Sequence, residues 1–194
     1  MLKSIVVLVS GGGTNLQALL DAQADGRLHS GRIVKVISDQ KDAYALVRAR
    51  DAHIEIATVE RKGKRLETFE RLLLEAIGQP DLIILAGFLT LLSPSFIARY
   101  PERIINVHPS LIPSFCGKGY YGIKVHQAAL AYGVKVTGAT VHYVNDIPDG
   151  GRILMQKAVA VRDDDTPQTL QRRVMEEAEW QLLWQAAEHI CEKE

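Results

Sequence analysis

Several features that would mark the sequence for export, a membrane or a metal are missing. The chain has two cysteines, Cys116 and Cys191, which lie far apart and outside any CxxC pattern. A disulfide framework and a zinc site are therefore not expected. The N-terminal apolar run at residues 5–9 is shorter than the ~7–15 residues of a signal peptide, and no run reaches the ~20 residues of a membrane span. We expect a cytoplasmic protein without a metal site.

An excess of charge of one sign is also missing. The sequence has 23 basic and 23 acidic residues, so its formal net charge is zero. A generic nucleic-acid-binding protein shows a basic excess, and binding along a nucleic acid is therefore not expected. The apolar fraction of 47% and charged fraction of 24% are typical of a globular protein. A chain of 194 residues suits one domain with its own core, and we expect residues 1–194 to form it.

Short apolar runs alternate with amphipathic runs through the first half of the chain. The apolar runs predict strands at residues 4–9, 33–37, 54–59, 82–86 and 104–107. The amphipathic runs predict helices at residues 14–24, 43–50 and 66–77. Alternation of this kind, with strands that are apolar throughout, indicates a parallel sheet covered by helices on both faces.

The second half has a different pattern. Strands are predicted at residues 136–144 and 153–161, and the turn between them is too short for a crossover helix, so they should be antiparallel. A long helix should begin near Thr166, a suitable N-cap, with Pro167 at its first position. The predicted fold is α/β: a Rossmann-like parallel sheet in the N-terminal half, antiparallel strands added in the C-terminal half, and a long C-terminal helix.

A glycine-rich loop, SGGGTNL at residues 10–16, joins the first strand to the first helix. Backbone N–H groups at a helix N-terminus attract anions, and glycines let a phosphate approach the backbone. Gly11 and Gly13 give the G-x-G of a dinucleotide site, but Leu16 occupies the third glycine position. Asp39 could hold a ribose, which leaves a nicotinamide-dependent oxidoreductase open, and a tight turn without ligand is a further alternative. The residues expected to hold a phosphate monoester are Gly13, Thr14 and Asn15.

The stretch INVHPSLIP places two polar side chains at the end of a buried strand. Asn106 and His108 are two residues apart, so they face the same side, at the sheet edge where parallel strands collect ligands. An amide donor beside a group that titrates near neutral pH suits acyl-type transfer. The alternative is a polar strand end satisfied by backbone groups.

Three later residues extend this pattern. Thr140 and His142 share one face of a later strand, and Asp149 lies in the turn NDIPDGG. A carboxylate near His108 would favour the imidazolium and raise the histidine's pKa. An Asp-Gly turn is also common between antiparallel strands, so the sequence leaves the position of Asp149 open.

Five motifs occur in one order: VLVSGGGTNLQALLDA, DLIILAGFLTLLSP, INVHPSLIPSFCGKGYYG, VKVTGATVHYV and DGGRILMQKAV. Over nearly the whole chain they resemble the phosphoribosylglycinamide formyltransferase family. The resemblance implies a single-domain formyltransferase fold and transfer of the formyl group of 10-formyltetrahydrofolate to glycinamide ribonucleotide in purine biosynthesis. It implies small-molecule substrates, no metal, no nucleic acid or membrane partner, and a monomer or homodimer.

The resemblance also assigns roles to individual residues. The implied catalytic residues are Asn106, His108 and Asp149, supported by Thr140 and His142. The implied ribonucleotide phosphate site is Gly13, Thr14, Asn15 and Glu179. The implied folate site is Arg65, Leu89, Thr90, Leu91, Leu92, Asn106, Asn145 and Asp146. The family often has arginine where this chain has Thr90.

Other functions stay open beside the resemblance. Methionyl-tRNA formyltransferase carries an extra C-terminal domain for which this chain has no room. The same catalytic trio could hydrolyse formyl-folate, as in the deformylase, although that enzyme has an N-terminal regulatory domain. A non-catalytic binder of a phosphorylated metabolite is the third possibility.

Overall fold

The computed structural model describes residues 1–193, and its framework is a seven-stranded sheet. The strands are β1 (Lys3–Val9), β2 (Gly31–Ser38), β3 (Glu55–Thr58), β4 (Leu82–Leu85), β5 (Ile104–His108), β6 (Val136–Tyr143) and β7 (Ile153–Ala160). They lie in the order β3-β2-β1-β4-β5-β6-β7. Strands β1 to β5 pair in parallel, whereas β6 is antiparallel to both β5 and β7. The predicted sheet is confirmed in both halves.

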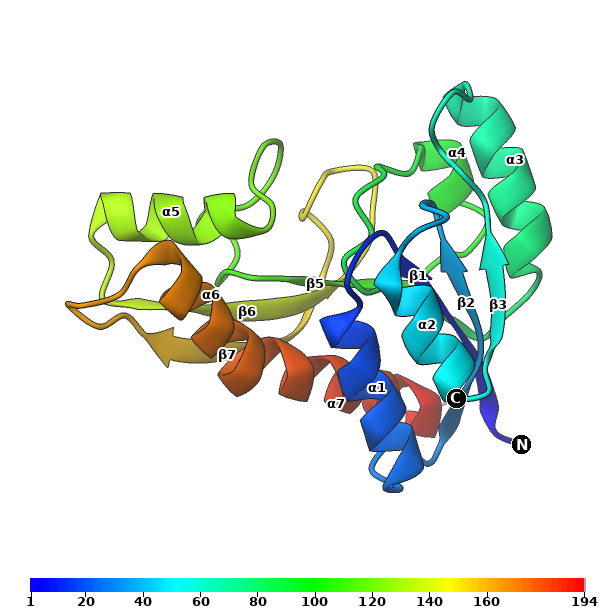
Figure 1. Ribbon diagram of the computed structural model, residues 1–194, viewed down its shortest axis with the longest axis horizontal. Coiled ribbons are helices and arrows are strands. Elements are labelled where there is room, and N and C mark those ends of the chain that lie inside the picture. Colours follow the sequence, from blue (N-terminus) through cyan, green and yellow to red (C-terminus); the bar gives the residue numbers. More distant parts are fainter. Residues whose placement is uncertain (194) are drawn as a thin grey trace.

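Helices cover both faces of this sheet (Figure 1). They are α1 (Thr14–Ala24), α2 (Tyr44–Asp51), α3 (Leu66–Ile77), α4 (Pro94–Ile97), α5 (Ile123–Tyr132), α6 (Pro167–Val174), the π-helical segment η1 (Met175–Glu179) and α7 (Trp180–Lys193). The sequence pattern did not predict α4, which is a single turn, or α5. Helix α5 follows a loop that contains Gly117, Gly119 and Gly122, and its apolar face is segregated no less than that of α1, which was predicted.

The alternation of side chains along β1 divides the core into two layers. Val7 and Val9 pack with α1, α2 and the C-terminal helices, whereas Val6 and Leu8 pack with α3 and α4. Since a central strand of a covered sheet is buried on both faces, this explains why β1 is apolar at nearly every position.

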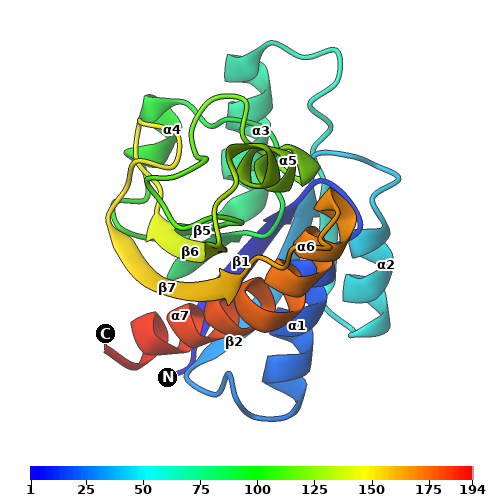
Figure 2. The same cartoon turned by 90° about the vertical axis from the view of Figure 1, so that its left-hand side faces the viewer.

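The C-terminal helix is continuous but contains one wide turn. Thr166 caps it by accepting a hydrogen bond from the Thr169 backbone N–H, and Pro167 occupies its first turn, as predicted. The π-helical turn η1 then separates α6 from α7. Helix α7 packs beside α1 (Figure 2), so the C-terminal helix reaches the region behind the glycine-rich loop.

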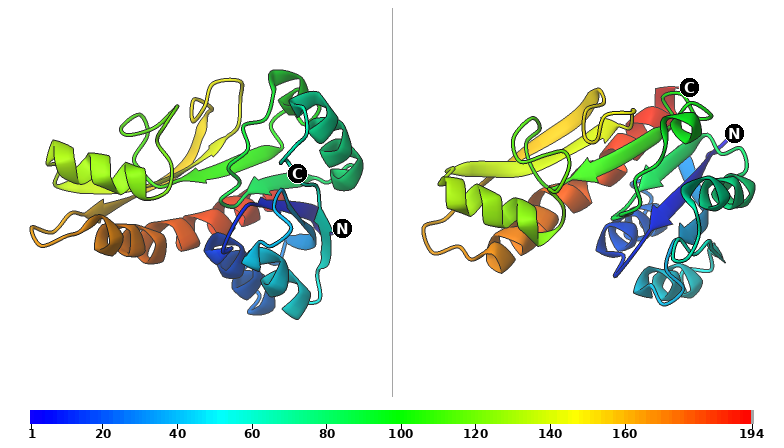
Figure 3. Two further views of the ribbon diagram at one scale, coloured as in Figure 1. Left: turned by 45° about the horizontal axis from the view of Figure 1, so that its top comes forward. Right: turned by 90° about the horizontal axis from the view of Figure 1, so that it is seen from above.

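Two features of the topology position the site. Strand β1 pairs with β2 on one side and β4 on the other, and such a switch in strand order opens a crevice at the carboxyl edge of a parallel sheet. The strands β5 to β7 extend the sheet away from the N-terminal strands (Figure 3). Within residues 1–193, no helix has both the length and the apolar character required to cross a membrane.

Candidate active site

Neighbouring strands β5 and β6 place the central polar side chains. Asn106 lies opposite His142 and His108 lies opposite Thr140 in the antiparallel register. Opposite residues in such a pair have side chains on the same face, so all four point to one side of the sheet. His108 and His142 are buried, whereas Asn106 is only partly buried and can be reached by a ligand.

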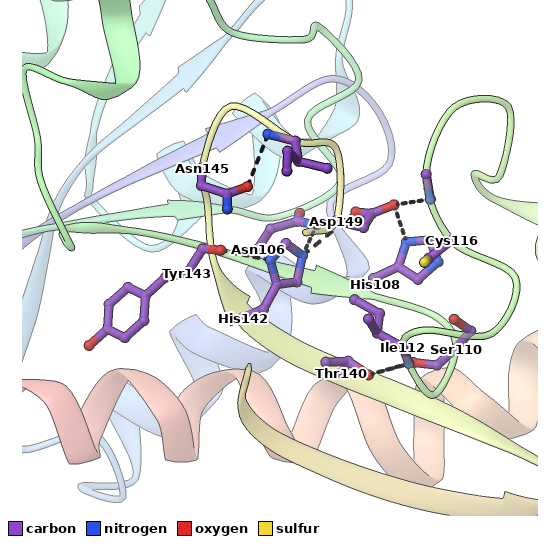
Figure 4. A network of polar contacts seen from close by, with 12 residues as sticks. Asn106, His108, Ser110, Ile112, Cys116, Thr140, His142, Tyr143, Asn145 and Asp149 are labelled. Atoms are coloured by element: carbon purple, nitrogen blue, oxygen red, sulfur yellow. Dashed lines mark hydrogen bonds and ion pairs between the residues drawn. The ribbon is translucent and has the colours of Figure 1, made fainter. Parts of the chain in front are cut away.

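Asp149 joins the two histidines, as Figure 4 shows. Its carboxylate oxygens lie 3.4 Å from His108 Nδ1 and 3.6 Å from His142 Nε2. The backbone N–H of Gly117 donates to Asp149 Oδ2 at 2.8 Å. Burial raises the pKa of Asp149, but the contacts with His142, His108 and Gly117 outweigh it, so the pKa lies below its ordinary value. Asp149 is therefore a fixed anion between two rings.

His108 is held at both ring nitrogens. Nε2 lies 2.9 Å from the carbonyl oxygen of Phe115, and Nδ1 faces Asp149. Burial lowers the pKa of His108 more than Asp149 and the Phe115 carbonyl raise it. Asp149 acts on the pKa of His108 in the expected direction, but the burial of the ring has the larger effect, so the expected net rise is not found. A proton taken up by His108 would nevertheless find oxygen acceptors already in place.

The amide of Asn106 is oriented by His142. Nδ1 of His142 lies 2.8 Å from the carbonyl oxygen of Tyr143 and must donate to it. While the ring is neutral, Nε2 accepts from Asn106 Nδ2 at 3.2 Å, and only a ring that also carries a proton on Nε2 can pair with Asp149 Oδ1 at 3.6 Å. One N–H of the Asn106 amide is thus occupied, while the second can point toward a ligand.

Thr140 holds the chain that follows β5. Its hydroxyl donates to the carbonyl of Ser110 at 2.7 Å and accepts from the backbone N–H of Ile112 at 3.1 Å. Gln156 on β7 donates to the same hydroxyl at 3.0 Å. The segment after His108 is therefore fixed from the neighbouring strands.

The glycine-rich loop forms a second polar region. Gly13 has a left-handed conformation with φ of 73° at the N-cap of α1, and Thr14 begins the helix. Asn15 Nδ2 donates to Glu179 Oε2 at 2.9 Å, so the structure brings together the two ends of the predicted phosphate site. Asn15 Oδ1 is buried and has no hydrogen-bond partner within residues 1–193.

Glu179 ends the π-helical turn and is only 6% exposed. Burial raises its pKa to about 7, and the single hydrogen bond from Asn15 offsets this only in part. π-Helical turns occur frequently at functional sites. Here the turn carries the acidic side chain that contacts the glycine-rich loop.

The segment after β4 carries four of the predicted folate residues. Ser10 Oγ accepts from the backbone N–H of Leu89 at 2.9 Å, and Thr90 Oγ1 donates to Asp39 Oδ2 at 2.7 Å. Leu91 is exposed and Leu92 packs against the core under α3 and α4. The hydroxyl of Thr90 is therefore occupied by its hydrogen bond to Asp39. The polar groups that this segment can offer a ligand are those of its backbone.

Exposed apolar side chains flank the polar cluster. Leu89, Leu91 and Ile147 are 65%, 68% and 61% exposed. Large apolar side chains gain by leaving water, so a ligand that covers them would be stabilised by the apolar contact. On the second loop, Asn145 Oδ1 accepts from the backbone N–H of Ile147 at 3.0 Å, while Asp146 is exposed.

Arg65 is the predicted residue that the structure leaves apart. It precedes α3, and the Arg65 side chain is 85% exposed. Its ion pair is with Glu67 in the first turn of α3 at 3.7 Å, and both side chains are exposed. No hydrogen bond within the described chain ties the Arg65 side chain to the other predicted folate residues.

Comparison with known proteins identifies the family of this chain. The formyl transferase family model matches residues 3–186. The phosphoribosylglycinamide formyltransferase of Escherichia coli is 38% identical over 88% of this chain and 79% of its own length. The chain belongs to this formyltransferase family.

Further relatives agree with this assignment. The chloroplastic phosphoribosylglycinamide formyltransferase of Arabidopsis thaliana is 40% identical over 98% of this chain, which spans 66% of that relative's length. The crystal structure of glycinamide ribonucleotide transformylase 1 from Symbiobacterium toebii has a TM-score of 0.89 and 40% identity, and the match covers 98% of this chain and 88% of that one. The predicted formyltransferase fold is confirmed.

Several contacts in this family member could not be found from the sequence. The Phe115 carbonyl and the Gly117 amide act through the backbone, so their residue types gave no signal. Asp39 was considered as a ribose ligand, but its carboxylate instead accepts from Thr90. Arg48 contacts the glycine-rich loop from α2, and no motif distinguishes it from other helical arginines.

Proposed function

We propose that this chain transfers the formyl group of 10-formyltetrahydrofolate to the amine of glycinamide ribonucleotide, a step of purine biosynthesis, and that residues 1–194 act as one formyltransferase domain. The observation that carries the proposal is Asp149, held between His108 and His142 beside the partly buried Asn106. This places an amide donor and a proton-accepting pair on the same face of the sheet. The relatives named above carry the same activity in their names.

Asn106 stabilises the charge that develops on the formyl oxygen. Its second amide N–H is free to donate, since the first is oriented toward His142 Nε2. A donor fixed in advance aids acyl transfer because it need not reorganise as the oxyanion forms. His142 therefore supports the reaction by holding the Asn106 amide.

Asp149 and His108 accept the proton that the amine loses and pass it to the folate nitrogen. As the amine nitrogen bonds to the formyl carbon it loses a proton, and the Asp149–His108 pair can hold it, because Oδ2 and Nδ1 are 3.4 Å apart. The pair then returns the proton to the folate nitrogen as its bond to the formyl carbon breaks. Burial, which lowers the pKa of His108, favours the neutral ring that can accept this proton.

The two substrates have separate places. The phosphate of the ribonucleotide lies at Gly13, Thr14 and Asn15, at the N-terminus of α1. The pterin lies along residues 89–92, with Asn145, Asp146 and Arg65 available to the remainder of the folate. A monomer or homodimer in the cytoplasm remains our prediction for this chain.

The experiment is an assay of purified protein with 10-formyltetrahydrofolate, with and without glycinamide ribonucleotide. We expect formylated ribonucleotide as the product and little formate when the amine is omitted. Equal formate release without the amine would instead identify a hydrolase. Ribonucleotide binding without any product would identify a non-catalytic binder, and tight NAD binding would favour an oxidoreductase.

A further inference from the structure

The glycine-rich loop is held from behind through its carbonyl groups. Gly11 O accepts from the Ala45 backbone N–H at 3.0 Å, and Gly12 O accepts from Arg48 Nε at 2.8 Å. In a trans peptide the C=O and the following N–H point in opposite directions. Anchoring these two carbonyls to α2 therefore turns the N–H groups of Gly12 and Gly13 away from α2, toward the side where an anion can bind.

Close packing against α2 reinforces this orientation. A Cβ added to Gly13 would lie 2.6 Å from the Ala45 Cβ, and Gly13 itself has a φ of 73°. Only glycine combines this conformation with so close an approach. The loop is therefore pressed onto the first turn of α2, within reach of the Arg48 side chain one turn later.

Arg48 links the loop to the first turn of α1 as well. Its Nη1 donates to Gln17 Oε1 at 2.9 Å while its Nε bonds Gly12 O. The guanidinium also lies over the ring of Tyr44, 5.0 Å from the ring centre. A planar fork can hold two acceptors in fixed directions, which the single ammonium of lysine does not reproduce.

We propose that Arg48 is a positioning residue for anion binding: it fixes the Gly12–Gly13 peptide with its N–H toward the phosphate, and its charge adds to the field at the N-terminus of α1. This inference rests on the proposed function, in which the loop binds the phosphate of the ribonucleotide. Helix α2 lies outside the glycine motif. In this proposal it nevertheless sets the direction in which the N–H groups of the motif point.

The test compares Arg48→Gln and Arg48→Lys with Arg50→Gln, a matched control on the exposed side of the same helix. Each variant is assayed for the KM of each substrate and for kcat. We expect Arg48→Gln to raise the KM for the ribonucleotide by about 10-fold or more, since a hydrogen bond to a charged group is lost. The KM for the formyl donor and kcat should stay within about twofold, Arg48→Lys should recover part of the loss, and Arg50→Gln should change nothing.

A binding measurement separates this inference from the proposed function. Calorimetry with ribose 5-phosphate and with ribose requires no catalysis, and Arg48→Gln should weaken binding of the phosphate ester alone. An unchanged ribonucleotide KM, or an equal rise in both KM values, would overturn the role of Arg48 while leaving formyl transfer intact. If Arg48→Gln does not fold, the same measurements are made on Arg48→Lys. A rise in its KM for the ribonucleotide alone would support the role of Arg48, and unchanged KM values would overturn it. Failure of the wild-type protein to bind ribose 5-phosphate would refute the phosphate loop and Arg48 together.

Discussion

The two halves of the proposed active site are built by opposite means. The glycine-rich loop presents backbone N–H groups from consecutive residues, and its first helical residues follow directly. The catalytic half instead gathers side chains from β5, β6 and the loop before β7, and the sequence separates Asn106 from Asp149 by more than forty residues. A site made from the backbone depends on conformation, whereas a site made from side chains depends on chemical identity.

The energetic consequences of the two designs also differ. In the catalytic half a small substitution that leaves the backbone intact should remove function, because the Asp149 carboxylate has fixed partners there. In the loop the identity of the side chains matters less than whether the backbone can adopt a left-handed turn. Three variants test this contrast.

Asp149→Asn should have the largest effect. The substitution keeps the shape of the side chain but removes the charge that lies between His108 and His142, so we expect kcat to fall by roughly 10³-fold. The thermal midpoint should change little by comparison. Asp164→Asn, a substitution at an exposed aspartate, is the control and should leave kcat unaffected. A kcat for Asp149→Asn within tenfold of the wild-type value would remove Asp149 from the mechanism.

Glu179→Gln should change the pH dependence of stability. The folded-state pKa of Glu179, about 7, lies above the ordinary value of 4.5. Its contribution to folding is therefore complete below pH 4.5 and is lost as the pH rises to about 7. The difference in free energy of unfolding between wild type and Glu179→Gln should fall by about 3 kcal/mol across this window. Chemical denaturation at several pH values measures it.

Glu188 provides the matched control on the same helix. It is 7% exposed, but burial of the Glu188 carboxyl, which raises its pKa, is outweighed by donors from Ser30 and His29, and the net pKa is lowered. Its contribution is therefore present above pH 4.5 and lost below. Glu188→Gln should show the opposite slope, and equal slopes in the two variants would contradict our description of Glu179.

Gly13→Ala tests the backbone half with the smallest expected effect. The added Cβ meets Ala45 and forces a non-glycine residue to a φ of 73°, so the free energy of unfolding should fall by about 2 kcal/mol. Gly11→Ala is the control, because nothing lies within 4 Å of a Cβ at Gly11. Equal stability of the two variants in urea denaturation would show that the loop does not require its left-handed residue.

The sequence predicted the contiguous features well. Apolar runs gave the strands, and helices α1 and α3 begin and end where the periodicity placed them. Helix α5 was not predicted, although its apolar and polar residues are segregated no less than those of α1. The glycine-rich loop was recognised because Gly11, Gly13, Thr14 and Asn15 are close together in the sequence.

The features that could not be predicted from the sequence are contacts between residues that only the folded chain brings together. The position of Asp149 between two histidines follows from the loop that returns from the end of β6, and no local pattern fixes that path. The lowered pKa of His108 follows from its burial, which a residue pair alone does not reveal. The contact of Arg48 with Gly12 joins residues from different helix–strand units.

The central claim is that Asn106 and Asp149 act on the same transition state, and a double-mutant cycle tests it most directly. The measurement is kcat/KM for formyl transfer by wild type, Asn106→Ala, Asp149→Asn and the double variant. Residues that act as a unit are strongly non-additive. We predict that each single variant loses roughly 10²–10³-fold and that the double variant loses little more than the worse single variant. Fully additive losses would contradict the account, because they would show that the two residues act independently.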